Sequence, residues 1–521
     1  LYWVAISMSK TIIIIGAGLA GLSAALQAAE NGCNVKLVSS LPSERAQSVM
    51  AEGGINAALN TKDENDSPEE HFTDTIKAAC GLADPNAVWG MTQAAPELVH
   101  WLLKLGVKFN MSGYDDVDLR NFGGQKKKRT AFAQSDTGKQ IMTAMIDAVR
   151  RKEASGMVER FSHHSFLTLR LCGNICCGCV IRDEYSQETV ELPGDAVIVA
   201  TGGMHGLFGN TTGSLSNTGE VTAELFRLGV PLANGEMIQY HPTTVKCGGK
   251  RMLISEAARG EGGRLFAMKD GKQWYFMEEK YPELGNLMPR DITAREIWKV
   301  SHESEVFLDM TEISEEIISN KLSGLADDCM TYLHKDIRKE PVSVLPGIHY
   351  FMGGILVDEQ HRTPIQNLCA AGECCAQYHG ANRLGGNSLL GALYGGRVAA
   401  KSACEQADVV DLSCATQIDF PPASQISEIK QLNKVMQETM GVVRNENTLL
   451  NGIQTVQALT GNLPLLGMAV LKSALARKES RGAHWREDYP KSNDDDYLKT
   501  TVARFDGKQI QISFVPVPER R

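Results

Sequence analysis

The sequence TIIIIGAGLAGLSAALQAAE at residues 11–30 decides the fold. Four consecutive isoleucines predict a short parallel strand that is buried on both faces. Gly16, Gly18 and Gly21 follow with the spacing GxGxxG and lead into a predicted helix, and a second strand is expected at residues 34–39. This order is typical of a doubly wound sheet, whose glycine turn and helix N-terminus hold the pyrophosphate of a dinucleotide.

The end of the second predicted strand departs from the usual dinucleotide pattern. An acidic residue that binds ribose is expected about 20 residues after the glycines, but Ser39 and Ser40 stand there. Hydroxyl groups can still donate or accept hydrogen bonds. The ribose contact is therefore expected to be made by serine instead of a carboxylate.

The composition indicates a globular protein and argues against a nucleic-acid partner. The chain has 521 residues with 43% apolar and 22% charged side chains, which predicts two to four domains. Its 53 basic and 62 acidic residues give a net charge of -9. The one obvious basic run, residues 126–129, is expected to be a solvated loop. Phosphate binding needs a larger basic face, so no nucleic acid is expected.

Cysteine usage and the N-terminus favour a cytoplasmic protein. The 13 cysteines are odd in number and irregularly spaced, which predicts reduced thiols. Cys176, Cys177 and Cys179 are interpreted as apolar filler near a strand, and no metal site is predicted.

The N-terminus shows no targeting signal. Residues 1–7 precede Met8 and contain no basic region followed by a long apolar stretch, so no signal peptide is expected. These seven residues are interpreted as an upstream artefact. The uncharged residues 11–29 could span a bilayer by length, but their glycine turn favours strand and helix.

Predicted strands and helices indicate how the rest of the chain is divided into domains. Strands are expected at residues 172–182, 196–200, 354–357 and 367–371, and helices at residues 86–105, 426–440 and 449–477, the last broken near Gly461 and Pro464. These elements predict a discontinuous nucleotide-binding domain of residues 8–234 and 350–418. An insertion of residues 235–349, a helical segment of residues 419–480 and a polar tail of residues 481–521 complete the expected organisation. The charged run at residues 479–486 is expected to be a solvated or partner-facing surface.

Several longer motifs occur in a fixed order along the chain. They are HPT at residues 241–243, SEAARGEGG at 255–263, PRD at 289–291, HYFMGG at 349–354, HGANRLGGNSLL at 379–390 and RKESRGAH at 477–484. Together with the glycine turn they resemble the flavoprotein subunits of succinate dehydrogenase and fumarate reductase. The resemblance covers nearly the whole chain. It implies an α/β fold: a Rossmann-like FAD-binding domain split by an inserted α+β capping domain, followed by a C-terminal helical segment.

The same resemblance implies an activity and a set of residues for it. The substrates would be fumarate and succinate, and a buried dicarboxylate needs cations and donors around it. His241, Ser255, His349 and Arg383 fall where the family contacts substrate, with Ser255 in place of the more usual threonine. The family motif assigns proton delivery to Arg290, with Glu256 and Arg259 as a relay. Glu256 and Arg259 lie three residues apart and would share one helix face.

FAD is the implied cofactor. The residues expected to hold it are Gly16, Gly18, Gly21, Ser39, Gln47, Gly53, Gly54, Thr201, Glu220, Glu373, Ser388 and Leu389. In the membrane-complex members a histidine that bonds covalently to the flavin occupies the position of Gln47. Because glutamine cannot make that bond, we expect non-covalent FAD, a lower flavin potential and fumarate reduction as the working direction.

Two other interpretations stay open at this stage. One is L-aspartate oxidase, a relative that would need no partner and is separated by assaying aspartate against succinate. The other is a non-catalytic FAD protein that scaffolds an electron-transfer complex. A single histidine or arginine is usually structural, so the enzyme is favoured only by the whole set. The chain shows no haem or cluster ligands, which implies an iron–sulfur partner subunit, with a membrane anchor beyond it, or a soluble flavin or thiol donor.

Overall fold

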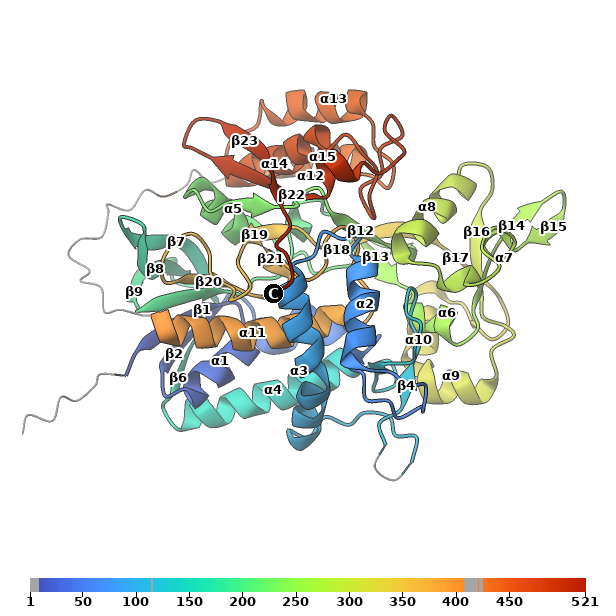
Figure 1. Ribbon diagram of the computed structural model, residues 1–521, viewed down its shortest axis with the longest axis horizontal. Coiled ribbons are helices and arrows are strands. Elements are labelled where there is room, and N and C mark those ends of the chain that lie inside the picture. Colours follow the sequence, from blue (N-terminus) through green and yellow to red (C-terminus); the bar gives the residue numbers. More distant parts are fainter. Residues whose placement is uncertain (1–8, 114–115, 407–419, 421–424) are drawn as a thin grey trace, which may run out of the picture.

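A five-stranded parallel sheet, in the left half of Figure 1, carries the glycine turn. The computed structural model describes residues 9–113, 116–406, 420 and 425–521. The strand order is β20-β10-β1-β2-β6. The strands are β1 (Thr11–Ile15), β2 (Asn34–Ser39), β6 (Val158–Ser162), β10 (Ala196–Val199) and β20 (Leu368–Ala370). β20 pairs with β10 although some 170 residues separate them, so segments on both sides of the expected insertion build one sheet.

The isoleucine run is buried on both faces of this sheet, as its sequence predicts. Ile12 and Ile14 pack among helices, whereas Ile13 and Ile15 pack against a second, antiparallel sheet, because side chains alternate along a strand. The helices are α1 (Leu19–Glu30), α3 (Pro85–Lys104), α4 (Thr137–Ala154) and α11 (Asn387–Gln406), and α2 (Pro68–Ala78) packs on α3. Within the described residues no helix has the length and apolarity that a bilayer crossing needs.

The antiparallel sheet comprises β7 (His164–Cys172), β8 (Ile175–Asp183) and β9 (Thr189–Pro193). The expected single strand over residues 172–182 is wrong at its start, since the chain turns at Gly173, whose φ is +60°, and pairs Cys172 with Ile175. Cys176 and Cys179 are buried in β8 as apolar filler. Eleven described cysteines are free thiols, but Cys172 is disulfide-bonded, against the expectation.

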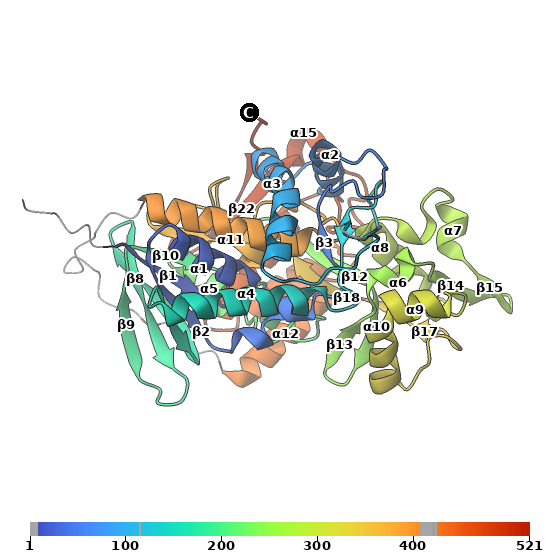
Figure 2. The same cartoon turned by 90° about the horizontal axis from the view of Figure 1, so that it is seen from below.

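The inserted segment folds around a separate hydrophobic core and lies beside the parallel sheet (Figure 2). One of its sheets has the order β13-β12-β18 and the other β15-β14-β16-β17. The elements are β12 (Ile238–Cys247), β13 (Lys250–Leu253), α6 (Glu256–Gly260), β14 (Arg264–Lys269), β15 (Lys272–Trp274), α7 (Phe276–Lys280), α8 (Arg290–Val300), β16 (Val306–Asp309), α9 (Glu315–Lys321), α10 (Ser323–Asp328), β17 (Val342–Ser343) and β18 (Leu345–Phe351). β12 and β18 run antiparallel, which brings His241 opposite Gly347 and close to His349.

The C-terminal region combines helices with a hairpin. The helices are α12 (Ile426–Thr439), α13 (Glu446–Val456), α14 (Asn462–Ala476) and the short α15 (Asp494–Tyr497). β22 (Lys499–Phe505) and β23 (Ile510–Pro516) extend a sheet of order β21-β19-β11-β22-β23, with β11 (Leu232–Ala233), β19 (Gly354–Leu356) and β21 (Cys375–Ala376). The expected polar tail is therefore wrong for residues 499–516. Ile510 and Ile512, which alternate with polar residues along β23, pack on the helical core. This alternation is typical of a strand, but the segment is polar on average and was therefore expected to be a tail.

The charged run at residues 479–486 is buried, so the expected solvated surface is wrong. The side chains of Arg477, Glu479 and Arg486 have no exposed area. Arg477 pairs with Glu236 at 2.7 Å and with Glu479 at 2.8 Å, and Arg486 pairs with Asp488 at 2.7 Å. Buried charges persist when each has a partner, and here one partner, Glu236, is distant in the sequence, whereas Glu479 and Asp488 lie two positions from the arginines that they pair with.

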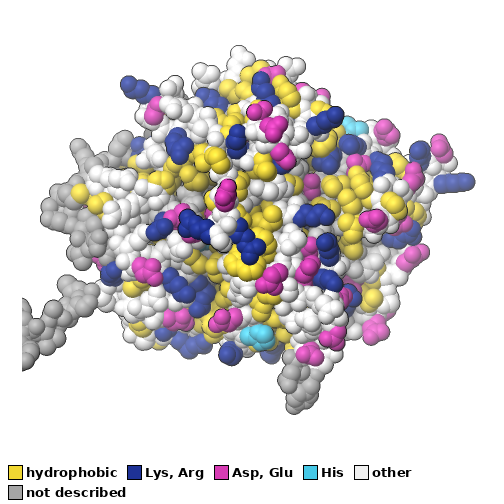
Figure 3. All heavy atoms as spheres, viewed as in Figure 1, with side chains coloured by type: hydrophobic (Ala, Val, Ile, Leu, Met, Phe, Trp, Pro, Cys, Tyr) yellow, Lys and Arg dark blue, Asp and Glu magenta, His cyan; other side chains and the backbone are white. Residues whose placement is uncertain are grey.

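The basic run at residues 126–129 is a solvated loop only in part. Lys126 and Lys128 are exposed, as expected. Arg129 is fully buried and pairs with Asp66 at 2.8 Å and with Asp74 at 3.0 Å, so the expectation is wrong for this residue. On the face shown in Figure 3, basic side chains are interspersed with acidic ones.

Four connecting elements complete the description. They are β3 (Ile55–Asn56), β4 (Leu119–Arg120) and β5 (Thr130–Ala131), which form a small sheet, and α5 (Glu220–Arg227). The predicted boundary at residue 418 and residues 1–7 lie outside the described residues.

Candidate active site

A cavity of about 1000 Å³ lies at the carboxyl edge of the parallel sheet, between that sheet and the inserted segment. One part of its wall comes from the turns that follow β1, β2, β10 and β20, and another part comes from β12, α6, α8 and β18. Ligands of doubly wound sheets bind at this edge. The cavity therefore joins the two sets of residues that the sequence motifs single out.

The glycine turn after β1 has the close packing that its spacing predicts. A Cβ on Gly16, whose φ is +111°, would lie 2.3 Å from the Ala200 carbonyl oxygen. A Cβ on Gly21 would lie 1.8 Å from the Gly16 carbonyl oxygen, so Gly21 lets α1 pack on the turn. Gly18 is the N-cap of α1, and as a glycine it has no side chain to cap the helix. Gly18 and the first residues of α1 line the cavity, so a helix N-terminus is available there to bind an anion.

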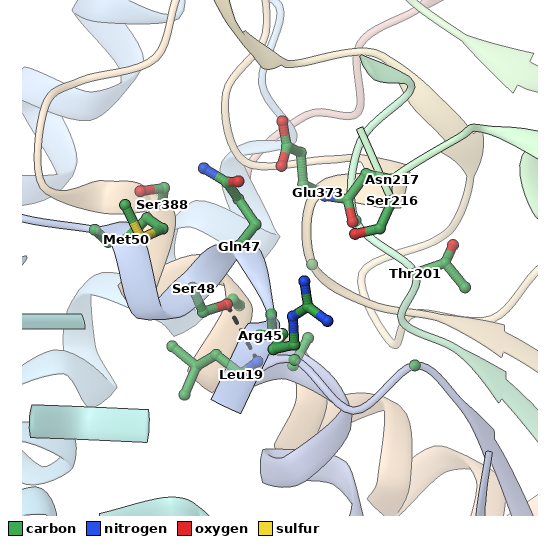
Figure 4. A pocket seen from close by; sticks show the side chains of 18 of the residues that line it. Leu19, Arg45, Gln47, Ser48, Met50, Thr201, Ser216, Asn217, Glu373 and Ser388 are labelled. Atoms are coloured by element: carbon green, nitrogen blue, oxygen red, sulfur yellow. Dashed lines mark hydrogen bonds between the residues drawn. The ribbon is translucent and has the colours of Figure 1, made fainter. Parts of the chain in front are cut away.

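The cavity wall fits an extended dinucleotide. The Ser39 hydroxyl is buried and has no partner among the described residues, so it is available to a ribose. Ser48 Oγ accepts a hydrogen bond from Leu19 N at 3.3 Å, beside the start of α1 (Figure 4). Figure 4 also shows Gln47 and Glu373 around the same space.

Most of the predicted cofactor residues line this cavity. They are Gly16, Gly18, Ser39, Gln47, Gly53, Gly54, Thr201, Glu220, Glu373, Ser388 and Leu389. Gly21 does not line it and acts through packing. Gln47 Oε1 accepts a hydrogen bond from Ser214 N at 2.5 Å, and Glu373 Oε1 accepts one from Phe351 N at 3.1 Å.

A buried cluster of two arginines and one glutamate lies at the wall formed by the inserted segment. Arg290, the first residue of α8, donates from Nε and Nη2 to Glu256 Oε2 at 2.7 and 2.5 Å. Arg259 Nη2 lies 3.3 Å from Glu256 Oε1 across one turn of α6, as the spacing predicts. Burial favours neutral Glu256, but Arg290 and Arg259 together hold its pKa below the usual value. The glutamate is therefore ionised and shared by two cations.

Arg259 does not line the cavity, whereas Arg290 and Glu256 do. Arg259 Nη1 donates to the Asn286 carbonyl at 2.6 Å. The three residues thus lead from the cavity wall into the protein, with Arg290 nearest the cavity.

A second arginine and two histidines line the same part of the cavity. Arg383 is 3% exposed, and its guanidinium lies over the Tyr350 ring at 4.3 Å. The rings of His241 and His349 are 5.1 Å apart. Burial, with Arg290 nearby, lowers the pKa of both histidines well below the usual value, so both are neutral. His241 Nε2 and Arg383 Nε have no partner among the described residues and remain available to a ligand.

Hydroxyl groups complete this part of the wall. Ser255 is the N-cap of α6, where its oxygen accepts from Ala257 N at 3.4 Å, so its hydroxyl proton can be donated to a ligand. Thr212 Oγ1 lies 2.8 Å from His349 Nδ1 and fixes that ring. Two cations, neutral imidazoles and hydroxyls suit a small dianion.

Thr212 and three further residues of the site were not predicted from the sequence. Gln239 contacts both Arg290 and Arg383, and its place two residues before His241 in a strand is the one signal that could have found it. Tyr350 packs on Arg383. Glu52 lines the cavity, and burial, followed by the charge of Asp328, raises its pKa to about 8.

Comparisons with known proteins agree with this geometry. Residues 11–389 match a family described as an FAD binding domain, and residues 459–520 match one described as fumarate reductase flavoprotein C-term. The chain is 38% identical to the succinate dehydrogenase flavoprotein subunit of Bacillus subtilis over 98% of each chain. It is 32% identical to the 8-methylmenaquinol:fumarate reductase flavoprotein subunit of Wolinella succinogenes, covering 98% of this chain and 92% of that one.

Among solved structures, the E. coli quinol fumarate reductase FrdA superimposes with a TM-score of 0.89 at 27% identity. The match covers 98% of this chain and 97% of that chain. The glycine turn and the inserted segment, which line opposite parts of the cavity, thus both lie in the matched part of the chain.

Proposed function

This chain belongs to the family of succinate dehydrogenase and fumarate reductase flavoprotein subunits. Because Gln47 stands in the place of the histidine that links the flavin, we propose that fumarate reduction is its working direction. It is an FAD-dependent oxidoreductase that interconverts fumarate and succinate. The observation that carries the assignment of roles is the buried cluster of Arg290, Glu256 and Arg259 beside Arg383 in the cavity wall.

The glycine turn and the starts of two helices hold the cofactor. Gly16, Gly18 and the N-terminal amides of α1 bind its pyrophosphate, and Ser39 binds ribose. Ser388 and Leu389, at the start of α11, place a helix N-terminus toward the flavin end. When bound, FAD supplies the hydride transfer of the reaction.

The substrate dianion is held by charge and by neutral donors. Arg383 binds one carboxylate, for which its free Nε is available. His349 and Ser255 donate to the other carboxylate, and so does His241 in the tautomer whose Nδ1 accepts from Thr243 N at 3.3 Å and whose Nε2 carries the proton. Because both histidines are neutral, they contribute hydrogen bonds without adding positive charge, and they stabilise the negative charge that develops on the carboxylate during the reaction.

Arg290 delivers the proton that the second alkene carbon requires. A free guanidinium holds its proton above about pH 12, so Arg290 gives up one N–H proton only as it receives another. Glu256 is ionised, so it passes to Arg290 a proton that it takes from Arg259 in the same step, and Arg259 must then regain a proton from bulk water. One proton enters the cluster for each proton that leaves it.

FAD is bound non-covalently because Gln47 stands where the linking histidine of the membrane-complex members is found. Its carboxamide oxygen is occupied by Ser214 N. An unlinked flavin is expected to have a lower potential, which favours reduction of fumarate. After acid precipitation of the loaded protein, the yellow colour should appear in the supernatant; colour in the pellet contradicts this assignment.

The electrons reach the flavoprotein from a partner. We assign this role to an iron–sulfur subunit, with a membrane anchor beyond it and a peripheral position on the cytoplasmic side of the membrane. The relatives above are themselves named as flavoprotein subunits. In the described residues no group of three or more His, Cys, Asp or Glu side chains is placed to hold a metal ion. Affinity capture of the tagged full chain should bring down a protein with iron–sulfur absorbance.

The test of the activity is fumarate-dependent oxidation of a reduced viologen dye by the FAD-loaded chain. Arg290→Ala should abolish turnover. Arg264→Ala is the matched control, because Arg264 makes a similar two-bond pair with Glu278 at 2.9 and 2.8 Å but lies outside the cavity.

The outcomes separate the possible activities. Turnover that Arg290→Ala removes and Arg264→Ala retains supports both the reductase and the proton donor. Bound FAD without turnover on fumarate contradicts fumarate reduction, and L-aspartate is then the next substrate to assay. Faster succinate oxidation than fumarate reduction contradicts the proposed direction alone.

A further inference from the structure

The side chain of Gln239 lies between the two arginines of the site. Gln239 is in β12 and has no exposed area. Its Oε1 accepts a hydrogen bond from Arg290 Nη1 at 3.2 Å. Its Nε2 donates to the Arg383 carbonyl at 2.9 Å and to Asn382 Oδ1 at 3.0 Å. One carboxamide therefore connects α8 of the inserted segment to the loop before α11 of the parallel-sheet region.

The orientation of this carboxamide follows from its neighbours. The Arg383 carbonyl can only accept, so it requires the NH₂ side of Gln239. The guanidinium of Arg290 can only donate, so it requires the oxygen side. Among side chains of this length, a neutral amide can donate to the Arg383 carbonyl and accept from Arg290 at the same time. An ionised carboxylate or a thioether makes at most one of these two hydrogen bonds.

The hydrogen bond to Gln239 also prevents a rotation of the Arg290 guanidinium that the pair with Glu256 still allows. Nε and Nη2 of Arg290 both bond to the same oxygen, Glu256 Oε2. A guanidinium held through one oxygen can still turn about that oxygen. The third bond, from Nη1 to Gln239, fixes the plane of the group and hence the direction of its remaining N–H groups.

We propose that Gln239 is a positioning residue, which holds the guanidinium of Arg290 and the main chain of Arg383 in one fixed relation. The inference rests on the proposed function, because it assigns Gln239 to the geometry of proton delivery. Reactive groups displaced by about 1 Å can lose on the order of 100-fold in rate. Gln239 therefore acts on the rate of turnover through Arg290, without contacting the reacting atoms.

The contacts of Gln239 point to a substitution whose effect on activity depends on pH. In Gln239→Glu, the new carboxyl group mimics the amide when protonated, because its O–H can donate to the Arg383 carbonyl and its C=O can accept from Arg290. When ionised, it faces the Arg383 carbonyl without a donor. Groups that face this position from the neighbouring elements are Arg290 on α8, Glu256 on α6, the Arg383 guanidinium, His241 on β12 and Tyr350 on β18.

The experiment measures kcat and KM for fumarate with reduced viologen, on FAD-loaded protein, between about pH 5.5 and 8.5. Gln239→Glu should lose activity relative to the unsubstituted protein as pH rises and regain at least about tenfold toward acid pH. Gln239→Met should lower kcat by about 10- to 100-fold at every pH, with a smaller change in KM. Binding of malonate, a dicarboxylate that cannot be reduced in this way, is followed in parallel by the flavin difference spectrum.

Gln27→Met is the matched control. Gln27 is also buried, donates to Asn31 Oδ1 at 3.0 Å within the α1 region, and lies outside the cavity. Its kcat and pH profile should equal those of the unsubstituted protein.

The proposal is overturned by an unshifted pH profile of Gln239→Glu, or by a kcat of Gln239→Met within about threefold of the unsubstituted value. Loss of FAD by both Gln239 variants also overturns it, because Gln239 would then serve folding instead of positioning. Absence of turnover in the unsubstituted, FAD-loaded protein is a different result, since it refutes the proposed function itself.

Discussion

Arg290 donates two hydrogen bonds to a single oxygen of Glu256, from Nε at 2.7 Å and from Nη2 at 2.5 Å. The pair joins the first residue of α8 to the first residue of α6. It leaves the other oxygen of Glu256 to Arg259 and the Gly123 amide, so every oxygen of the buried carboxylate has a partner. A cation held this way stays at the cavity wall, beside a carboxylate that also pairs with Arg259.

Arg290→Lys should lower kcat for fumarate reduction by about 10²- to 10⁴-fold, the range that a general acid contributes. An ammonium keeps the charge but cannot contact Glu256, Gln239 and a substrate at the same time in the geometry of a guanidinium. Stopped-flow or steady-state oxidation of reduced viologen measures the effect. Arg264→Lys, in the equivalent surface pair with Glu278, should retain kcat; a similar loss in both variants would show that the effect is general.

Substitutions of two glycines in the same turn should have different consequences. Gly21→Ala puts a Cβ 1.8 Å from the Gly16 carbonyl, so it should lower the thermal unfolding midpoint even without FAD. A Cβ on Gly18 meets protein atoms only at 3.6 Å. Gly18→Ala should therefore fold normally but bind FAD at least about tenfold more weakly, which corresponds to ~1.4 kcal/mol. Fluorescence titration of the apoprotein with FAD, beside a thermal scan, distinguishes the two; equal FAD affinity of Gly18→Ala and the parent would contradict the placement of the pyrophosphate.

Buried histidines should make the folded protein less stable in acid. Burial lowers the pKa of His361 from its usual 6.5 to about 4, although its contact with the Ala370 carbonyl favours the charged form. The unfolded chain binds a proton more readily than the folded chain between these values. The free energy of unfolding is therefore fully retained above pH 6.5 and falls as pH decreases toward 4, by up to about 1.4 kcal/mol per pH unit for this one group.

His361→Gln should remove that part of the pH dependence. Urea unfolding at several pH values measures the slope for both proteins. His361 contacts the Tyr378 hydroxyl and the Ala370 carbonyl, away from the cavity, so the substitution tests stability and not catalysis. An unchanged slope would mean that His361 binds protons equally well in the folded and the unfolded chain.

The buried arginine at the end of α14 should be important for stability. Arg477→Met leaves the carboxylate of Glu236 buried without its cation and leaves Glu479 with Arg481 alone, and removing one partner of a buried pair typically costs about 3–5 kcal/mol. Arg338→Met, which breaks an exposed pair with Asp336, should change the unfolding midpoint little. Chemical denaturation of both variants tests this, and equal midpoints would contradict the role assigned to the Arg477 network.

The sequence by itself determined the centre of the fold and most of the cavity wall. The isoleucine run and the glycine spacing predict β1, the turn and α1, all of which the structure shows. Local residue types are sufficient here, because they determine both the burial of the strand and the close packing of the backbone at the turn. The ordered motifs also indicated Arg290, Arg383 and the two histidines, which the structure places around one cavity.

Only the tertiary structure decided which charged side chains are buried. The sequence around Arg129 and Arg477 looks like that of a solvated segment, and each arginine is paired with a carboxylate far away in the sequence, Asp66 for Arg129 and Glu236 for Arg477. The same holds for Gln239, whose contact with Arg383 spans 144 positions. A residue's type sets what it can bond to, but its burial and its partner are set by which distant segments the fold brings together.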